Sequence, residues 1–268
     1  MKKVNLFLLV LAIFMASCGT TRTVPVTGRK QNLVVSDEQM LSLSTQQYNE
    51  YMKKAKKSTN TANTAMVQRV GKKLATAVET YLKHNGLANE LSGYKWEFNL
   101  VKDNSVNAFC MPGGKIVVYE GLLPVTKNET ALAIVLGHEI AHAVAKHSAE
   151  QLSKQYKQQV GMQIGSAVLS ASGMGANTSS LLEWATSKGL QLRNLKYSRD
   201  HENEADHMGL IFAAMAGYNP NEAVTFWQRM AAASGGSSSD FLSDHPSDAK
   251  RVENIKGWLP EALKYYKK

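Results

Sequence analysis

A His-Glu-x-x-His motif, His138-Glu139-x-x-His142, constrains this 268-residue chain more than any other feature. A helix advances by about 100° per residue, so the two histidines lie about 40° apart on one face and can bind the same metal ion. The carboxylate of Glu139 lies beside them, where it can hold the attacking water. Two imidazoles, a carboxylate and an open position are typical of a hydrolytic zinc site. We therefore predict one Zn²⁺ per chain, with Glu139 as the catalytic group.

The motif lies in an unusually apolar helix. Residues 126–129, Thr-Lys-Asn-Glu, fit a capping box at its start. Between Ala131 and Val144 nearly every residue outside the motif is apolar, so we expect this helix at the centre of the protein. A metal-free motif that only caps the helix would bury two histidines and a glutamate without partners, which is costly. His147 would lie 180° from His138 on the same helix, so we expect it in solvent.

The N-terminus predicts export. Residues 1–17 combine two lysines with a short apolar run, which indicates a signal peptide that is too short to span a membrane. Residues 15–19, Met-Ala-Ser-Cys-Gly, resemble a bacterial lipobox, which implies cleavage before Cys18 and its lipidation; an ordinary secretory signal with an incidental cysteine is the alternative. Residues 18–35 are then a polar tether, and residues 36–268 form one catalytic domain. We expect a lipid-anchored protein of the bacterial envelope, at the outer membrane facing the periplasm.

Composition excludes some partners. The formal net charge is +9, but the basic residues are scattered among acidic ones and form no strip with interleaved aromatic residues, so we do not expect nucleic acid as a partner. Apart from Cys18, the chain has only Cys110, so it has no disulfide framework.

Two helices, over 36–57 and 65–84, precede a strand over 94–100 that alternates apolar and polar residues. The next stretch, 107–119, contains Pro112, which cannot donate to a strand ladder and therefore indicates an edge or a bulge. Such an edge can hold an extended substrate by strand addition, although a plain hairpin fits equally well. The candidate residues for the substrate strand are Asn107, Ala108, Phe109, Gly113 and Gly114.

A third metal ligand has to come from another part of the chain. The metzincin pattern would require glycine at 145 and histidine at 148, where this chain has Ala145 and Ser148. A helix near residues 198–206 offers Glu202 and Asp206 one turn apart on the same face, so one carboxylate can bind zinc while the other accepts the outward N–H of a ligand histidine. His201 and His207 are possible ligands too, but neither has such a partner. We choose Glu202 as the ligand and Asp206 as its support. Glu204 points about 200° away from Glu202 and is left without a role.

His245 is the second candidate catalytic residue. It precedes Pro246 and follows a Gly/Ser-rich linker over 234–239, so its segment could move onto or off the metal helix. An imidazole there could fill the open position of the zinc and inhibit the enzyme, or it could stabilise the oxyanion. A role as a simple helix-boundary residue fits as well as both functional roles together. Arg251 is another candidate for the oxyanion.

These motifs together resemble one family of zinc endopeptidases, which includes the CAAX prenyl protease, the heat-shock membrane protease and the periplasmic beta-barrel assembly-enhancing protease. The resemblance extends over about residues 20–260 and includes Pro-Val-Thr-Gly-Arg at 25–29 and His245-Pro246. It implies an α+β, mainly helical, zincin-like (gluzincin) fold with a small sheet beside the metal helix. It implies His138, His142 and Glu202 as zinc ligands and endopeptidase activity.

The chain is most similar to the periplasmic lipoprotein branch of that family, without the tetratricopeptide repeats of the assembly-enhancing protease. We expect it to degrade misfolded or unassembled envelope proteins. The alternative is an envelope assembly chaperone or binding protein with a zinc site and little proteolysis.

Overall fold

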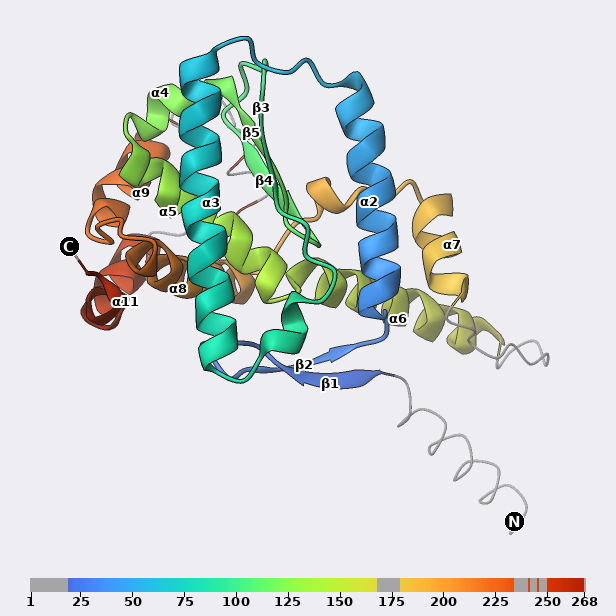
Figure 1. Cartoon of the computed structure of the whole chain (residues 1–268). Coiled ribbons are helices and arrows are strands. Elements are labelled where there is room, and N and C mark those ends of the chain that lie inside the picture. The colour runs from blue at the N-terminus through green and yellow to red at the C-terminus, as the bar shows by residue number, and fades with distance from the viewer. Residues whose placement is uncertain (1–18, 168–178, 234–240, 242–244, 246–249, 268) are drawn as a thin grey trace.

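The computed structural model describes residues 19–167, 179–233, 241, 245 and 250–267. Within this part the chain is mainly helical with small sheets. One helix, Glu129–Val144, is central and contacts several of the other helices and the larger sheet (Figure 1). The helices are α2 (Asp37–Lys54), α3 (Thr61–His84), α4 (Leu123–Thr126), α5 (Glu129–Val144), α6 (His147–Ala167), α7 (Ser179–Ser187), α8 (Arg199–Met215), α9 (Glu222–Ala233) and α11 (Arg251–Tyr265). The strands are β1 (Thr20–Thr23), β2 (Lys30–Leu33), β3 (Glu97–Val101), β4 (Ala108–Met111) and β5 (Lys115–Tyr119). Among these helices, none has both the length and the hydrophobicity needed to cross a bilayer.

The metal helix is α5, and every residue from Ala131 to Val144 is buried, as its composition predicts. Its start differs from the prediction. Lys127 has a left-handed backbone with φ of 65°, which interrupts the helix after Thr126. The cap is therefore Asn128, whose side chain accepts a hydrogen bond from the backbone N–H of Ala131.

A three-stranded sheet packs along α5 with the strand order β3-β5-β4. The stretch 107–119 forms two strands, because Gly113 and Gly114 both have positive φ and turn the chain back as an antiparallel hairpin. β3 adds to β5 in parallel. β4 therefore has β5 on one side only and is an edge of the sheet, next to α5.

Residues 20–33, which the sequence predicts as a tether, are ordered as an antiparallel strand pair. β1 pairs with β2 from Thr20↔Leu33 to Thr23↔Lys30. The pair is fixed to the body of the protein because Val24 and Leu33 are buried and β2 packs against α6 (Figure 1). The polar composition of this stretch therefore hid a structural role.

Close packing of α8 on α5 sets the geometry of the site. The two helices meet at Gly137 and Gly209, where a Cβ on Gly209 would lie 2.7 Å from the backbone nitrogen of His138. A Cβ on Gly137 would lie 2.8 Å from the carbonyl oxygen of Gly209. Only glycine allows the two backbones to approach this closely, so this pair brings the carboxylates of α8 to the histidines of α5.

A break at Lys146 separates α5 from α6. Lys146 has a left-handed backbone with φ of 55°, and its side chain forms ion pairs with Asp37 (2.9 Å) and Glu90 (2.6 Å). The prediction that His147 lies in solvent is wrong for this reason. It assumed one continuous helix, whereas the break turns His147 back towards α5, where it is fully buried.

Candidate metal centre

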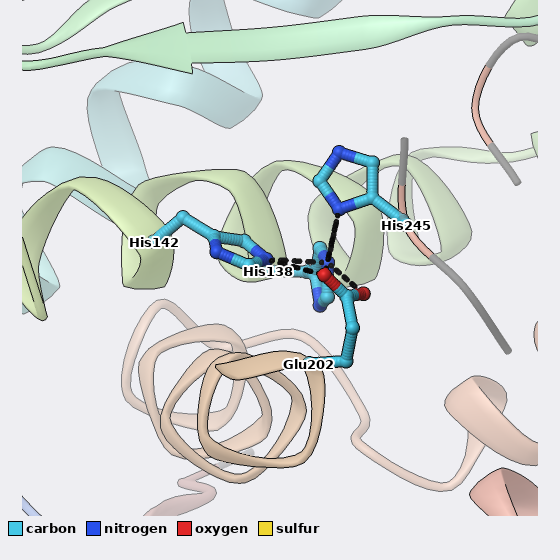
Figure 2. Close-up of side chains that lie close together, drawn as sticks. All are labelled: His138, His142, Glu202 and His245. Atoms are coloured by element: carbon cyan, nitrogen blue, oxygen red, sulfur yellow. Dashed lines mark hydrogen bonds and ion pairs between the residues drawn. The ribbon is translucent and has the colours of Figure 1, made fainter. Parts of the chain in front are cut away.

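Four side chains converge beside α5, and all four are buried (Figure 2). The Nε2 atoms of His138 and His142 are 3.1 Å apart. Glu202, from α8, places Oε2 3.3 Å from His138 Nε2 and Oε1 3.3 Å from His142 Nε2. His245 Nδ1 lies 3.2 Å from His138 Nε2 and 3.2 Å from Glu202 Oε1. All four ligand atoms lie within 4.8 Å of one another, so the group could hold one metal ion.

The spacing of these atoms fits zinc. Ligand atoms about 2.0–2.1 Å from a tetrahedral zinc ion are about 3.3 Å apart, which is close to five separations of 3.1–3.3 Å in this cluster, whose ligand atoms all lie within 4.8 Å. The chemistry fits as well. Imidazole nitrogens and a carboxylate oxygen are the ligand atoms that zinc takes in hydrolytic sites, and all of them are buried here.

The outward nitrogen of His138 has an anionic partner. His138 Nδ1 lies 2.8 Å from Asp206 Oδ1, the arrangement that fixes the tautomer of a metal-binding histidine. Arg251 donates to the same oxygen at 2.7 Å and stacks on Trp227, 3.3 Å above the ring centre. Its Nη1 lies 3.6 Å from Oε2 of Glu202, so Arg251 also reaches the donor cluster and its candidacy as an oxyanion donor stays a prediction.

Charge around the cluster favours a cation. Burial lowers the pKa of His138, but the carboxylates of Asp206 and Glu202 outweigh it and raise that pKa to about 9. Burial holds the pKa of His142 well below its ordinary value. Although burial acts in the opposite direction, the surrounding histidines hold the pKa of Glu202 well below its usual range. The site thus offers an ionised carboxylate and a field that attracts positive charge.

Glu139 lies beside the cluster and is buried. One of its oxygens lies 3.5 Å from His245 Nε2, and its carboxylate accepts a hydrogen bond from the backbone N–H of Cys110 in β4. Burial raises the pKa of Glu139, against the opposing effect of His245 and His138. A raised pKa suits a group that takes up and releases a proton during a reaction.

The predicted substrate strand lies against this carboxylate. Ala108 and Phe109 belong to β4 and are buried, Asn107 immediately precedes the strand, and Gly113 and Gly114 form the turn to β5. Since the N–H of Cys110 points to Glu139 and not to β5, the unpaired edge of β4 faces the metal centre.

His245 contributes the fourth donor atom. Its ring stacks on that of Phe241 with the ring centres 4.5 Å apart, and its backbone N–H donates to the Phe241 carbonyl at 2.9 Å. Phe241 is fully buried and its own N–H donates to the carbonyl of Val106. The side chain is thus held over the position that would be open in a hydrolytic zinc site.

Two neighbours of the motif, the acidic Glu204 and the aromatic Tyr197, were not predicted from the sequence. Glu204, which the helical wheel leaves without a role, is buried and pairs with His147 and Arg29. Tyr197 stacks on His142 with the ring centres 4.1 Å apart, and its hydroxyl pairs with that of Ser148. Neither contact has a signal in the sequence, because each joins segments at least 49 residues apart. Cys18 lies outside the described residues, so its lipidation stays a prediction.

Comparisons with known proteins agree with this geometry. Residues 61–259 match the model of Peptidase family M48, and this range contains the whole cluster. The chain is 37% identical over 187 residues to the mitochondrial metalloendopeptidase OMA1 of Schizosaccharomyces pombe, a match that covers 69% of this chain and 53% of the relative. Human OMA1 is 31% identical over 245 residues, which cover 90% of this chain and 46% of the relative. The metalloprotease LoiP of Escherichia coli is 28% identical over 174 residues, 64% of this chain and 66% of the relative.

These relatives correct the predicted location. The more similar of the relatives named here are mitochondrial metalloendopeptidases, which contradicts the prediction of a lipid-anchored protein in a bacterial outer membrane. That prediction depended on residues 1–19 and on the resemblance to the periplasmic lipoprotein branch, and short N-terminal patterns of this kind carry little information about a compartment. The chain spans about half the length of the OMA1 relatives that it matches.

The match to the family model extends over most of the chain, and the residues that the motif singles out meet in one buried cluster whose spacing fits a single zinc ion. The chain therefore belongs to Peptidase family M48, which confirms the predicted class of enzyme, a zinc metalloendopeptidase.

Proposed function

We propose that this protein cleaves unfolded or unassembled polypeptides at a zinc centre formed by His138, His142 and Glu202. The observation that carries the proposal is the position of Glu139, which lies between the donor cluster and the unpaired edge of β4. A structural zinc site has no use for a buried carboxylate that binds no metal, and such sites are usually closed by cysteine ligands.

In this mechanism His138, His142 and Glu202 hold the metal, and Asp206 keeps His138 in the tautomer that leaves Nε2 free for binding. When bound, zinc supplies Lewis acidity that polarises the scissile carbonyl. Glu139 removes a proton from the attacking water and passes it to the leaving amine. The raised pKa of Glu139 helps it to keep that proton between the two steps.

An extended substrate suits the edge of β4. A peptide that adds to this edge as a further strand would run past Glu139, so its backbone would lie across the donor cluster. Strand addition recognises the backbone of a peptide more than its side chains. Folded proteins rarely expose a free extended segment. These two facts favour unfolded or unassembled chains as substrates.

A binding protein with little proteolysis is the second candidate. It is favoured by His245, because a fourth protein donor closes the set and leaves no position for a substrate. A fourth protein donor is compatible with proteolysis if the His245 side chain leaves the donor cluster when a substrate binds.

The experiment is proteolysis of casein by the purified chain and by the Glu139→Gln variant, with zinc content measured on both. Glutamine cannot accept the proton, but the metal ligands are intact, so we expect one zinc per chain in both proteins and proteolysis only in the parent. Equal proteolysis by the variant would refute the mechanism. Absence of proteolysis in both proteins, with zinc present, would favour the binding protein.

A further inference from the structure

The two histidines of the motif differ in what holds their outward nitrogens. His138 Nδ1 faces the carboxylate of Asp206 directly. His142 Nδ1 faces another imidazole, with His147 Nδ1 at 2.8 Å. The second nitrogen of His147, Nε2, lies 2.9 Å from Glu204 Oε2. The support of His142 is thus one residue longer than that of His138, and it also ends on a carboxylate.

The direction of these hydrogen bonds follows from the metal site. His142 Nε2 points into the donor cluster and has to present a lone pair there, so its proton is on Nδ1. That N–H donates to His147 Nδ1, which leaves the proton of His147 on Nε2, from which it donates to Glu204. Each imidazole donates one hydrogen bond, His147 also accepts one from His142, and the chain of bonds ends on an anion that only accepts.

The carboxylate of Glu204 is itself fixed by the segment that joins β1 to β2. Arg29 donates to Glu204 Oε2 from Nε at 2.9 Å and from Nη2 at 2.7 Å. Thr27 donates to the other oxygen of Glu204. The Arg29 guanidinium also donates two hydrogen bonds to the carboxylate of Glu150, from Nη1 at 2.8 Å and from Nη2 at 2.7 Å.

We propose that His147 and Glu204 form a hydrogen-bond relay that positions His142 as a metal ligand, and that Arg29 holds the outer end of this relay. The relay crosses three segments that are distant in sequence, and Arg29 lies outside residues 61–259, the range that matches the family model. The strand pair β1–β2 thereby contributes to the metal centre without touching the metal. The inference rests on the proposed zinc site.

The test measures zinc affinity of the full chain by competition with a chelator, together with the visible absorption spectrum of the Co²⁺-loaded protein. His147→Phe keeps the ring volume but removes both hydrogen bonds. We expect zinc affinity to fall on the order of 10–100-fold, as for other groups that orient a metal ligand, and the Co²⁺ bands to shift. His147→Asn keeps an acceptor near Nδ1 and should restore part of the affinity.

His207→Phe is the matched control. His207 is also paired with a glutamate, Glu261 at 2.7 Å, and it also stacks on an aromatic ring, that of Trp258 at 5.2 Å. It has no contact with His142, so its substitution should leave zinc affinity within about threefold and the Co²⁺ spectrum unchanged.

If His147→Phe fails to fold, Arg29→Gln tests the outer end of the relay from a half-exposed position. It should weaken zinc binding by a few fold and shift the Co²⁺ bands in the same direction. Zinc affinity and Co²⁺ spectra that are the same in the parent, in the foldable relay variants and in His207→Phe would overturn the relay. A parent chain that binds no zinc would instead overturn the proposed function.

Discussion

We expect His245 to determine how many positions at the metal centre are open to a substrate. Its Nδ1 lies 3.2 Å from both His138 Nε2 and Glu202 Oε1, at the distance expected between two ligands of one zinc ion. Of the two functional roles that the sequence leaves open, this position fits the blocking role better than the oxyanion role. A side chain that occupies the open position has to leave before a carbonyl can take its place.

His245→Ala should therefore raise the basal rate of casein cleavage, because it opens the fourth position without removing His138, His142 or Glu202. Zinc should remain bound, although less tightly, since one of four donors is lost. The rate per zinc-loaded chain is the quantity to measure. A lower rate at equal zinc content would assign His245 to the oxyanion, and an unchanged rate would leave it as a helix-boundary residue.

His138 predicts how zinc binding depends on pH. Before the metal binds, the pKa of His138 is raised to about 9, so at pH 7 this imidazole carries a proton that zinc has to displace. His142, with its lowered pKa, and ionised Glu202 release none. Zinc binding near pH 7.5 should release about one proton, and the apparent affinity should rise about tenfold per pH unit up to about pH 9.

Calorimetry in buffers of different ionisation enthalpy measures that proton. Asp206→Asn provides the control, because it removes the largest charge that raises the His138 pKa and should reduce the number of protons released. Proton release that is zero at pH 7.5 in the parent would contradict the assignment.

At the scale of the elements, the site depends on the close packing of α5 and α8. Gly209→Ala would place a Cβ 2.7 Å from the His138 backbone nitrogen, and since the obstacle is backbone, the helices would have to separate. Overpacking of this kind costs about 1–3 kcal/mol of unfolding free energy, and it would also draw Glu202 and Asp206 away from the histidines. We expect both a lower melting temperature and weaker zinc binding.

Gly257→Ala in α11 is the matched substitution, because no atom lies within 4 Å of the added Cβ. Alanine inside a helix is favoured over glycine by roughly 0.5–1 kcal/mol, so this variant should be as stable as the parent or more so. Thermal unfolding and chelator competition on both variants would test the idea. Equal behaviour of the two variants would show that the close approach does not matter.

For the molecule as a whole, zinc should link the site to stability. The cluster joins α5, α8 and the segment of His245, so an ion held there cross-links elements that are distant in sequence. A ligand present at 100 times its dissociation constant adds about 2.7 kcal/mol to the unfolding free energy. For a chain of this size we expect chelation to lower the melting temperature by roughly 5–10 °C. Removal of zinc with no change in melting temperature would contradict this expectation.

The sequence by itself determined the local part of the site. His138 and His142 share a face because four residues make about one helical turn, with Glu139 beside them, and Glu202 and Asp206 are together on α8 for the same reason. The apolar composition of α5 placed it in the core. These inferences need only the period of a helix and the hydrophobicity of its side chains.

Only the tertiary structure decided the rest, because the remaining contacts follow no period. The left-handed backbone at Lys146 turned His147 from the expected solvent face to the outward nitrogen of His142. The strand pair β1–β2 brought Arg29 within 2.7 Å of Glu204, 175 residues away, although its polar sequence predicts a tether. A helical wheel describes one helix, whereas these residues meet across a helix break, a helix crossing and a sheet. The hydrogen bonds and ion pairs between them form only when the whole chain is packed.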